Sequence, residues 1–350
     1  FGVSGATRTL LEALVPYSEA SFDEFLGQKP PQYVSDETAH LLAGRAFTRA
    51  RWLDSEANPQ IGLACTATII TDRPKRGEHR AHIATWQPSR LVCYSLFLDK
   101  GARDREGEED LVSRVLLNGL AKACGISSQI PMPFVPNDVL EITEHNFAQM
   151  VRRLLRGEIT HFGISDHGET KAAETPPPIL LSGSFNPLHN GHLALARIVG
   201  DLLGQDVAFE LSVINADKPP LPEEMALDRI AQFAGRYPVF AGNAPTFVEK
   251  ARLYPRTTFL VGYDTAARIL QTRYYGNSTE AMEGAIDEIG KLGCRFLVAG
   301  RAMNGGQFLQ ADDLLIPSRF QELFQGISPN LFREDVSSTE LRRTGRKGSR

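Results

Sequence analysis

The stretch Ile179-Leu-Leu-Ser-Gly-Ser-Phe-Asn-Pro-Leu-His-Asn-Gly-His192 joins a short apolar run to a helix-forming segment. Residues 179–182 are typical of a buried strand, and the spacing of apolar residues from about 189 to 203 predicts a helix. The loop between them therefore lies at the carboxyl end of a strand and at the start of a helix. Unpaired backbone N–H groups and the positive end of the helix dipole meet there and favour an anion. We expect a phosphate-binding site.

Four residues of this loop carry the expected chemistry. Gly183 is expected to let a ligand approach the backbone closely. Gly191, one turn into the helix, costs about 1 kcal/mol relative to alanine, which indicates that something comes near it. His189 and His192 are three residues apart and share a helix face. Each can donate a hydrogen bond to a phosphate oxygen without bringing a permanent charge.

Two other interpretations of the histidines remain open at this point. They can be part of an ordinary turn with no ligand. They can also be two metal ligands, but the segment offers no carboxylate or thiolate as a third. We therefore predict no protein-bound metal.

The chain after this loop alternates strands and helices. This alternation predicts a Rossmann-like, doubly wound parallel sheet covered on both faces, with ligands bound beyond the carboxyl ends of the strands. Strands are predicted at 209–213, 259–261 and 295–299, and helices at 223–234, 247–253, 265–270 and through Ile286 and Ile289.

The chain before this loop is predicted to form a separate α/β domain. Ser35 is expected to cap a helix, strands are expected at 61–70, 80–87 and 91–98, and further helices at 106–124 and 146–156. The polar, proline-ended stretch 168–178 resembles a stiff linker. We predict a first domain over 1–157, a linker over 158–178, a second domain over 179–343 and a basic tail over 344–350.

Composition narrows the classes of protein. The net charge of −4 gives no basic excess for binding a nucleic-acid backbone. No apolar run approaches the roughly 20 residues of a membrane-spanning helix. The four cysteines form no C-x-x-C pair, and Cys65 and Cys93 lie in apolar, strand-like runs, which suits reduced, buried thiols in a reducing compartment. We expect a cytoplasmic protein, or an organellar one if a targeting segment precedes Phe1.

Two motifs resemble those of the nucleotidyltransferase superfamily. The string from Gly183 to His192 resembles its G-x-F-x-P-x-H-x-G-H signature, and residues 336–342 resemble its I-S-S-T-x-[IL]-R motif. By itself, the second motif is better explained as a helix cap followed by a surface arginine. Together, the motifs imply catalytic roles for His192 and His189. They also imply that ATP and its phosphates are bound by Gly183, Ser184, Phe185, Gly191, Ser337, Ser338, Thr339 and Arg342.

The sequence Phe185-Asn-Pro-Leu-His189 is similar to the corresponding segment of the nicotinamide and nicotinate mononucleotide adenylyltransferases. Residues 215–221 resemble their N-x-x-K segment, which implies that Asn215 and Lys218 contact the mononucleotide. Gly262 and Asp264 resemble their G-x-D element on the adenosine side. Each segment alone is weaker, because Lys218 can be a solvated lysine and Asp264 a helix cap.

The resemblance implies adenylyl transfer from ATP, with Mg²⁺ on the triphosphate, to the 5′-phosphate of a pyridine mononucleotide. The choice between the amide and the acid mononucleotide stays open, with Tyr263, Tyr274 and Tyr275 as candidates to stack on the base. Two other functions stay open as well: a cytidylyltransferase-like enzyme with another phosphate acceptor, and a regulatory protein that binds nucleotides without turnover.

Residues 1–157 resemble the C-terminal domain of competence-damage-inducible protein A, a nicotinamide mononucleotide deamidase family. The matching stretches are 15–18, 33–39, 62–66 and 106–125. The lysine that this family places after its Tyr-Ser-Asn is missing behind Tyr17 and Ser18, and its T-G-x-A-G-P loop is replaced over 66–74. Because no activated nucleophile is visible, we expect a non-catalytic domain that acts as a scaffold, senses a ligand or forms a homo-oligomer.

Overall fold

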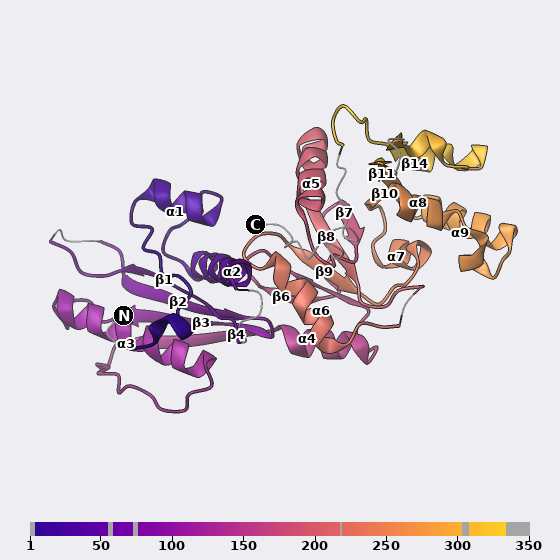
Figure 1. The fold of residues 1–350 in the computed structure, drawn as a ribbon. Helices are drawn as coiled ribbons and strands as arrows, with labels where there is room; N and C mark the ends of the chain where they lie inside the picture. Colours follow the sequence, from indigo (N-terminus) through magenta and orange to yellow (C-terminus); the bar gives the residue numbers. More distant parts are fainter. Residues whose placement is uncertain (1–3, 55–58, 73–75, 218, 303–307, 334–350) are drawn as a thin grey trace. The chain divides into compact units, whose positions relative to one another are not determined.

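The computed structural model describes residues 4–54, 59–72, 76–217, 219–302 and 308–333 (Figure 1). Helices separate consecutive strands from Ile179 to Ala299, as the predicted doubly wound α/β fold requires. The chain divides into two compact units. The first unit comprises 1–149, 165–170 and 231–237, and the second unit comprises the remaining residues.

The first unit is built on a four-stranded antiparallel sheet in sequential order. Its strands are β1 (Gly62–Thr68), β2 (His79–Gln87), β3 (Arg90–Leu98) and β4 (Val139–Asn146). Helix α3 (Arg105–Ala123) packs on one face of this sheet, and α2 (Asp36–Leu53) packs against β1 and β2 on the other. Helix α1 (Glu19–Leu26) contacts α2, and η1 spans Ala6–Arg8. Ser35 caps α2 as predicted, since its side chain accepts from the Thr38 N–H.

The second unit holds an eight-stranded sheet in the order β14-β11-β10-β7-β8-β9-β5-β6. Its strands are β5 (His161–Ile164), β6 (Thr170–Ala172), β7 (Ile179–Gly183), β8 (Val207–Ser212), β9 (Val239–Gly242), β10 (Thr258–Gly262), β11 (Arg295–Ala299) and β14 (Phe324–Gly326). The six strands from β7 onward are parallel, in the relative order 3-2-1-4-5-6 that doubly wound sheets use. The order reverses between β7 and β10, where such sheets bind their ligands.

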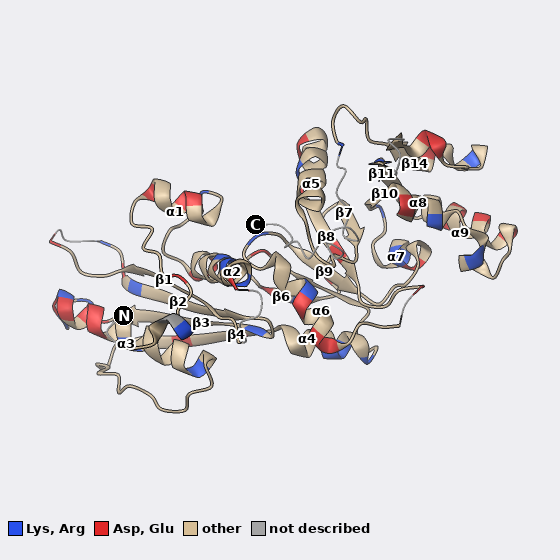
Figure 2. Cartoon of the chain, in the orientation of Figure 1, with Lys and Arg blue, Asp and Glu red and all other residues tan. Residues whose placement is uncertain are grey.

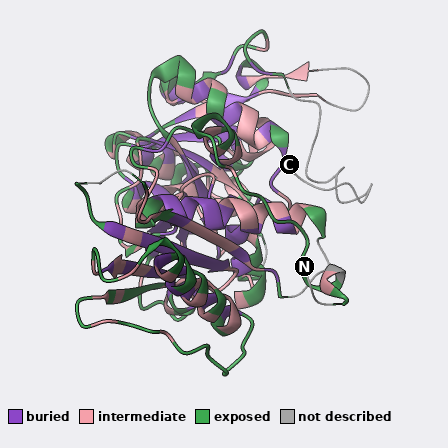
Figure 3. Ribbon diagram, turned by 90° about the vertical axis from the view of Figure 1, so that its left-hand side faces the viewer, coloured by how far each residue is buried: buried purple, intermediate pink, exposed green. Residues whose placement is uncertain are grey.

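Short helices connect these strands. They are α4 (Phe147–Leu155), α5 (Asn190–Leu203), α6 (Glu223–Ile230), α7 (Phe247–Leu253), α8 (Tyr263–Ile269) and α9 (Thr279–Lys291), with 3-10 turns η2 (Ala231–Phe233), η3 (Thr272–Tyr275), η4 (Ala311–Asp313) and η5 (Ser318–Leu323). Strands β12 (Arg301–Ala302) and β13 (Phe308–Leu309) form a separate pair. Buried residues concentrate in the sheet strands (Figure 3). Lysine and arginine residues are interspersed with acidic residues on the helices of both units (Figure 2).

The structure differs from the sequence prediction at strands β5 and β4, among other places. The stretch 158–178, predicted to be a linker, contains β5, whose four residues are all buried and pair with β9. Four residues are too short a run to give a periodic signal. Strand β4 was not predicted, because it is an edge strand with mostly exposed and polar side chains. None of the helices in the described ranges combines the length and apolarity needed to cross a bilayer.

Candidate active site

The loop of the first motif connects the central strand β7 to α5 as predicted. His189 is the N-cap residue of α5 and has extended backbone angles. Phe185 takes a left-handed conformation with φ 44°, and its side chain is 1% exposed. Its ring packs edge-on against His192 and Phe209, with ring centroids 5.2 and 5.6 Å apart. The loop is therefore anchored in the core by the phenylalanine of the motif.

The two histidines lie against each other, with ring centroids 3.8 Å apart and planes inclined by 30°. The backbone N–H of His189 donates to Nδ1 of His192 over 3.3 Å. Burial, together with His189, lowers the pKa of His192 to about 3, and burial also lowers the pKa of His189. His192 is therefore neutral at pH 7. Because its Nδ1 accepts a hydrogen bond, its proton lies on Nε2, which is a donor.

The two motif glycines at strand ends serve different purposes. A Cβ on Gly183 would lie 2.8 Å from the ring of Phe185, so glycine is required there by the protein's own packing. Gly262 ends β10 and is exposed, and a Cβ there would meet no described atom within 4 Å. Open space beside the backbone therefore lies at Gly262. At Gly183, the ring of Phe185 occupies the space where a Cβ would lie.

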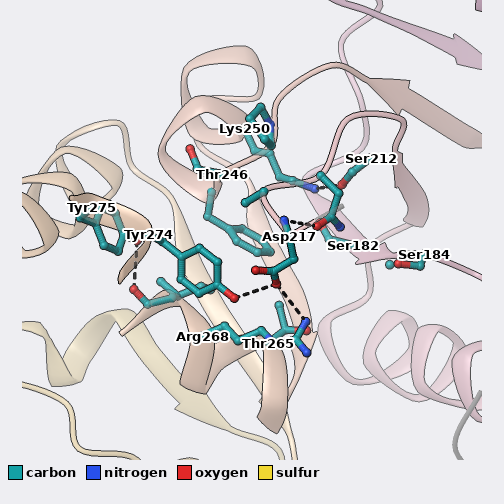
Figure 4. A pocket seen from close by; sticks show the side chains of 16 residues that line it. Ser182, Ser184, Ser212, Asp217, Thr246, Lys250, Thr265, Arg268, Tyr274 and Tyr275 are labelled. Carbon is teal, nitrogen blue, oxygen red and sulfur yellow. Dashed lines mark hydrogen bonds and ion pairs between the residues drawn. The ribbon is translucent and has the colours of Figure 1, made fainter. Parts of the chain in front are cut away.

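A pocket opens beyond the carboxyl ends of β7 and β8 (Figure 4). The empty space within it, counting open solvent at the mouth, is about 780 Å³. Strand ends, the following loops, α7, α8 and η3 contribute its lining: Ser182, Gly183, Ser184, Ser212, Asn215, Ala216, Asp217, Pro245, Thr246, Phe247, Lys250, Thr265, Arg268, Ile269, Tyr274 and Tyr275. The pocket thus collects three predicted site residues, Gly183, Ser184 and Asn215, and two of the candidate aromatic residues.

The loop after β8 is tied to the opposite wall of this pocket. Asn215 Oδ1 accepts from the backbone N–H of Asp217 over 2.9 Å. The Asp217 carboxylate accepts from the Tyr274 hydroxyl over 2.7 Å and lies 3.7 Å from the Arg268 guanidinium. Asp217 therefore fixes the loop that carries the predicted mononucleotide contact Asn215.

A buried polar cluster in the pocket wall was not predicted from the sequence. Lys250 on α7 forms an ion pair with Glu210 on β8 and donates to Ser212 Oγ over 2.6 Å. Lys250 is 3% exposed and Glu210 is fully buried. The two residues are 40 positions apart, and only the fold brings them together. The available signal was Glu210 itself, because a carboxylate inside an apolar strand needs a partner.

The other predicted residues lie apart from the pocket lining or outside the described ranges. Phe185 and Gly191 are buried in and behind the loop. Asp264 forms an ion pair with Arg301, and both side chains are partly exposed. Lys218 and the second motif, with Ser337, Ser338, Thr339 and Arg342, lie outside the described residues, so their predicted contacts stay predictions.

Comparison with known proteins identifies the family of the second half of the chain. Residues 180–344 match the model of a family described as cytidylyltransferase-like, a span that begins in β7 and includes both motifs. Residues 180–344 are a cytidylyltransferase-like domain. The observed parallel sheet is consistent with the Rossmann-type fold of that family.

Two curated relatives are similar to part of the chain. A protein of Schizosaccharomyces pombe, provisionally named a nicotinamide mononucleotide adenylyltransferase, is 32% identical over 112 residues, which is 28% of this chain and 44% of the relative. An FAD synthase of Methanosarcina mazei is 30% identical over 89 residues, 25% of this chain and 59% of the relative. The matches thus span about half the length of these relatives. No solved structure matches the chain significantly.

Proposed function

We propose that this chain transfers the adenylyl group of ATP to the 5′-phosphate of nicotinamide or nicotinate mononucleotide. A phosphate oxygen of the acceptor would bond to the α-phosphorus, and pyrophosphate would leave. The observation that carries the proposal is the neutral Nε2–H donor of His192 at the start of α5, which follows the central strand β7, whose last residues line the pocket. The cytidylyltransferase-like match and the two relatives' names support it.

The residues of the loop would act by position and by hydrogen bonding. The start of α5 and the neutral histidine donors favour the negative charge that develops on the phosphates. Gly183, Ser184 and Asn215 would place the two substrates in the pocket, and proximity supplies much of the rate in such transfers. Lys218 and Arg342 would add the cations that the phosphates need. Asp264, Ser337, Ser338 and Thr339 would complete the ATP side.

We propose that Mg²⁺ enters with ATP. Within the described ranges, no three histidine, cysteine or acidic side chains gather as a metal site. Magnesium commonly keeps several waters and binds through substrate phosphates. Its charge would offset that of the triphosphate, while the protein supplies the donors described above.

A substrate panel tests the proposal. The protein is incubated with Mg²⁺ and ATP or CTP, and with nicotinamide mononucleotide, nicotinate mononucleotide, flavin mononucleotide or phosphopantetheine. We expect dinucleotide from ATP and a pyridine mononucleotide. The FAD synthase similarity makes flavin mononucleotide the second acceptor to examine. Product only with CTP or phosphopantetheine contradicts the proposal, and ATP binding without any turnover supports a regulatory protein.

We further propose that the first unit contributes no deamidase activity. Ser18 caps α1 by accepting from the Ser21 N–H, and Tyr17 is 95% exposed. Both therefore have structural interpretations, and the resemblance of 1–157 to the deamidase family remains a prediction. Formation of nicotinate mononucleotide from the amide by the full chain would contradict this assignment.

A further inference from the structure

The charged side chains that line the pocket compensate one another. Within the described lining, the charged residues are Asp217, Lys250 and Arg268. Lys250 pairs with Glu210 behind the wall, and Arg268 lies beside Asp217. The described pocket therefore offers two cations and two carboxylates, and no cation without a carboxylate beside it.

The ion pair of Lys250 and Glu210 is a buried part of this wall. Lys250 is 3% exposed and Glu210 is fully buried, so the pair cannot separate without leaving a charge in an apolar surrounding. An ammonium group has three N–H donors, and Glu210 and Ser212 use two of them. The third can donate to an uncharged carbonyl oxygen.

A second polar group at this end of the sheet has no partner. Ser182 Oγ is buried, lines the same pocket, and makes no hydrogen bond among the described residues. In the sheet register, Ser182 of β7 is paired with Glu210 of β8, so the hydroxyl lies on the strand next to the one that carries Glu210. A hydroxyl can both donate and accept. It can therefore satisfy either end of an amide.

We propose that this pocket selects the acceptor whose base carries an uncharged carboxamide over the one that carries a carboxylate. The inference rests on the proposed function and decides between its two acceptors. A carboxamide needs only hydrogen-bond partners in the pocket. A carboxylate loses its hydration on entry and needs an unpaired cation, which the described wall does not offer.

The wild-type protein gives the first test. We expect kcat/KM for nicotinamide mononucleotide to exceed that for nicotinate mononucleotide by at least about 10-fold, at saturating ATP and Mg²⁺. Turnover of both acceptors with the acid preferred would overturn this inference and leave the proposed function intact. Turnover of neither would overturn the proposed function and, with it, the inference.

A charge variant gives the second test. Glu210→Gln removes the counter-ion of Lys250. The carboxylate of nicotinate mononucleotide can then act as the counter-ion of Lys250. We expect the amide-to-acid ratio to fall at least 10-fold relative to wild type. The double variant Glu210→Gln/Lys250→Met removes the unpaired cation together with the Lys250 donor, so its amide-to-acid ratio should lie above that of Glu210→Gln and still favour the amide.

Glu288→Gln is the matched control. Glu288 of α9 forms an exposed ion pair with Arg252, which lies on α7 as Lys250 does. Its ratio should stay within two-fold of wild type. An unchanged ratio in folded Glu210→Gln would overturn the role of the pair. If Glu210→Gln does not fold, the wild-type and double-variant ratios decide, and acid preference in either would overturn the proposal.

Discussion

Two polar clusters of the second unit differ in how the sequence encodes them. His189 and His192 lie three residues apart at the start of α5 and meet through one turn of backbone. Lys250 and Glu210 lie 40 residues apart and meet only because β8 and α7 are packed together. The first cluster was visible as a local motif, and the second was not. Local spacing thus reveals donors built into a helix start, whereas buried ion pairs between elements require the fold.

The buried pair is predicted to give the largest effect on stability. Lys250→Met leaves Glu210 buried without a counter-ion, which should lower the free energy of unfolding by about 3–5 kcal/mol. Urea unfolding of the variant measures this loss. Replacing both residues, as Lys250→Met/Glu210→Leu, should recover most of it.

Arg252→Met is the control for that comparison. Arg252 lies on α7, as Lys250 does, and forms an exposed ion pair with Glu288 of α9. It should change stability little, because exposed pairs contribute little. Equal losses for the buried and the exposed pair would show that burial does not distinguish them.

The histidine cluster is predicted to give the largest effect on activity. His192→Ala removes the Nε2–H donor, and kcat should fall about 10²–10³-fold, as for other removed transition-state donors. Initial rates of dinucleotide formation measure it, and thermal melting checks the packing against Phe185. His145→Ala, a half-buried histidine of the first unit, should keep the wild-type rate. Full activity in His192→Ala would remove its assigned role.

The two strand-end glycines should separate packing from ligand binding. Gly183→Ala places a methyl group 2.8 Å from the Phe185 ring and should destabilise the protein by about 1–3 kcal/mol. Gly262→Ala places it in open space with φ −78°. Stability should then change by less than about 0.5 kcal/mol, while KM for ATP rises. The opposite pattern in unfolding and ATP titrations would reverse the two assignments.

The remaining prediction is a pH dependence of stability. The pKa of His192 is lowered from its usual 6.5 to about 3, so the unfolded chain binds a proton before the folded one does. Its contribution is fully present above pH 6.5 and is lost as the pH falls toward 3, by at most about 1.4 kcal/mol per pH unit. His40, with a pKa of about 4, acts in the same direction. Unfolding free energies at pH 7, 6 and 5 should therefore decline less steeply in His192→Asn than in wild type, and parallel declines would contradict a buried, neutral His192.

Much of the fold was predictable because its elements carry periodic patterns and caps. The strands β2, β3 and β11, the helices α3 and α7, and the Ser35 cap all follow the predicted ranges within a residue or two. Strands β5 and β9 were missed since four residues give no period, and β4 because its side chains are mostly exposed. The helix predicted over 223–234 is observed as the α-helix α6 followed directly by the 3-10 turn η2.

The candidate site was predictable where one loop carries it. The position of His189 as N-cap follows from the strand–loop–helix pattern, but the tautomer of His192 depends on a hydrogen bond that only the structure shows. The sequence assigned Gly183 to a ligand, and this stays a prediction; the packing of the Phe185 ring, which is a second reason for glycine there, could not be read from the sequence. The pairing of Asp217 with Tyr274 joins loops 57 residues apart and has no local signature.

Labelled ATP tests the central claim most directly. The protein is supplied with nicotinamide mononucleotide, Mg²⁺ and ATP labelled on either the α- or the γ-phosphate. The proposed transfer predicts α label in the dinucleotide and γ label in pyrophosphate, in equal amounts, with both signals reduced at least 100-fold in His192→Ala. Label released as orthophosphate, or γ label joined to the acceptor, would contradict adenylyl transfer.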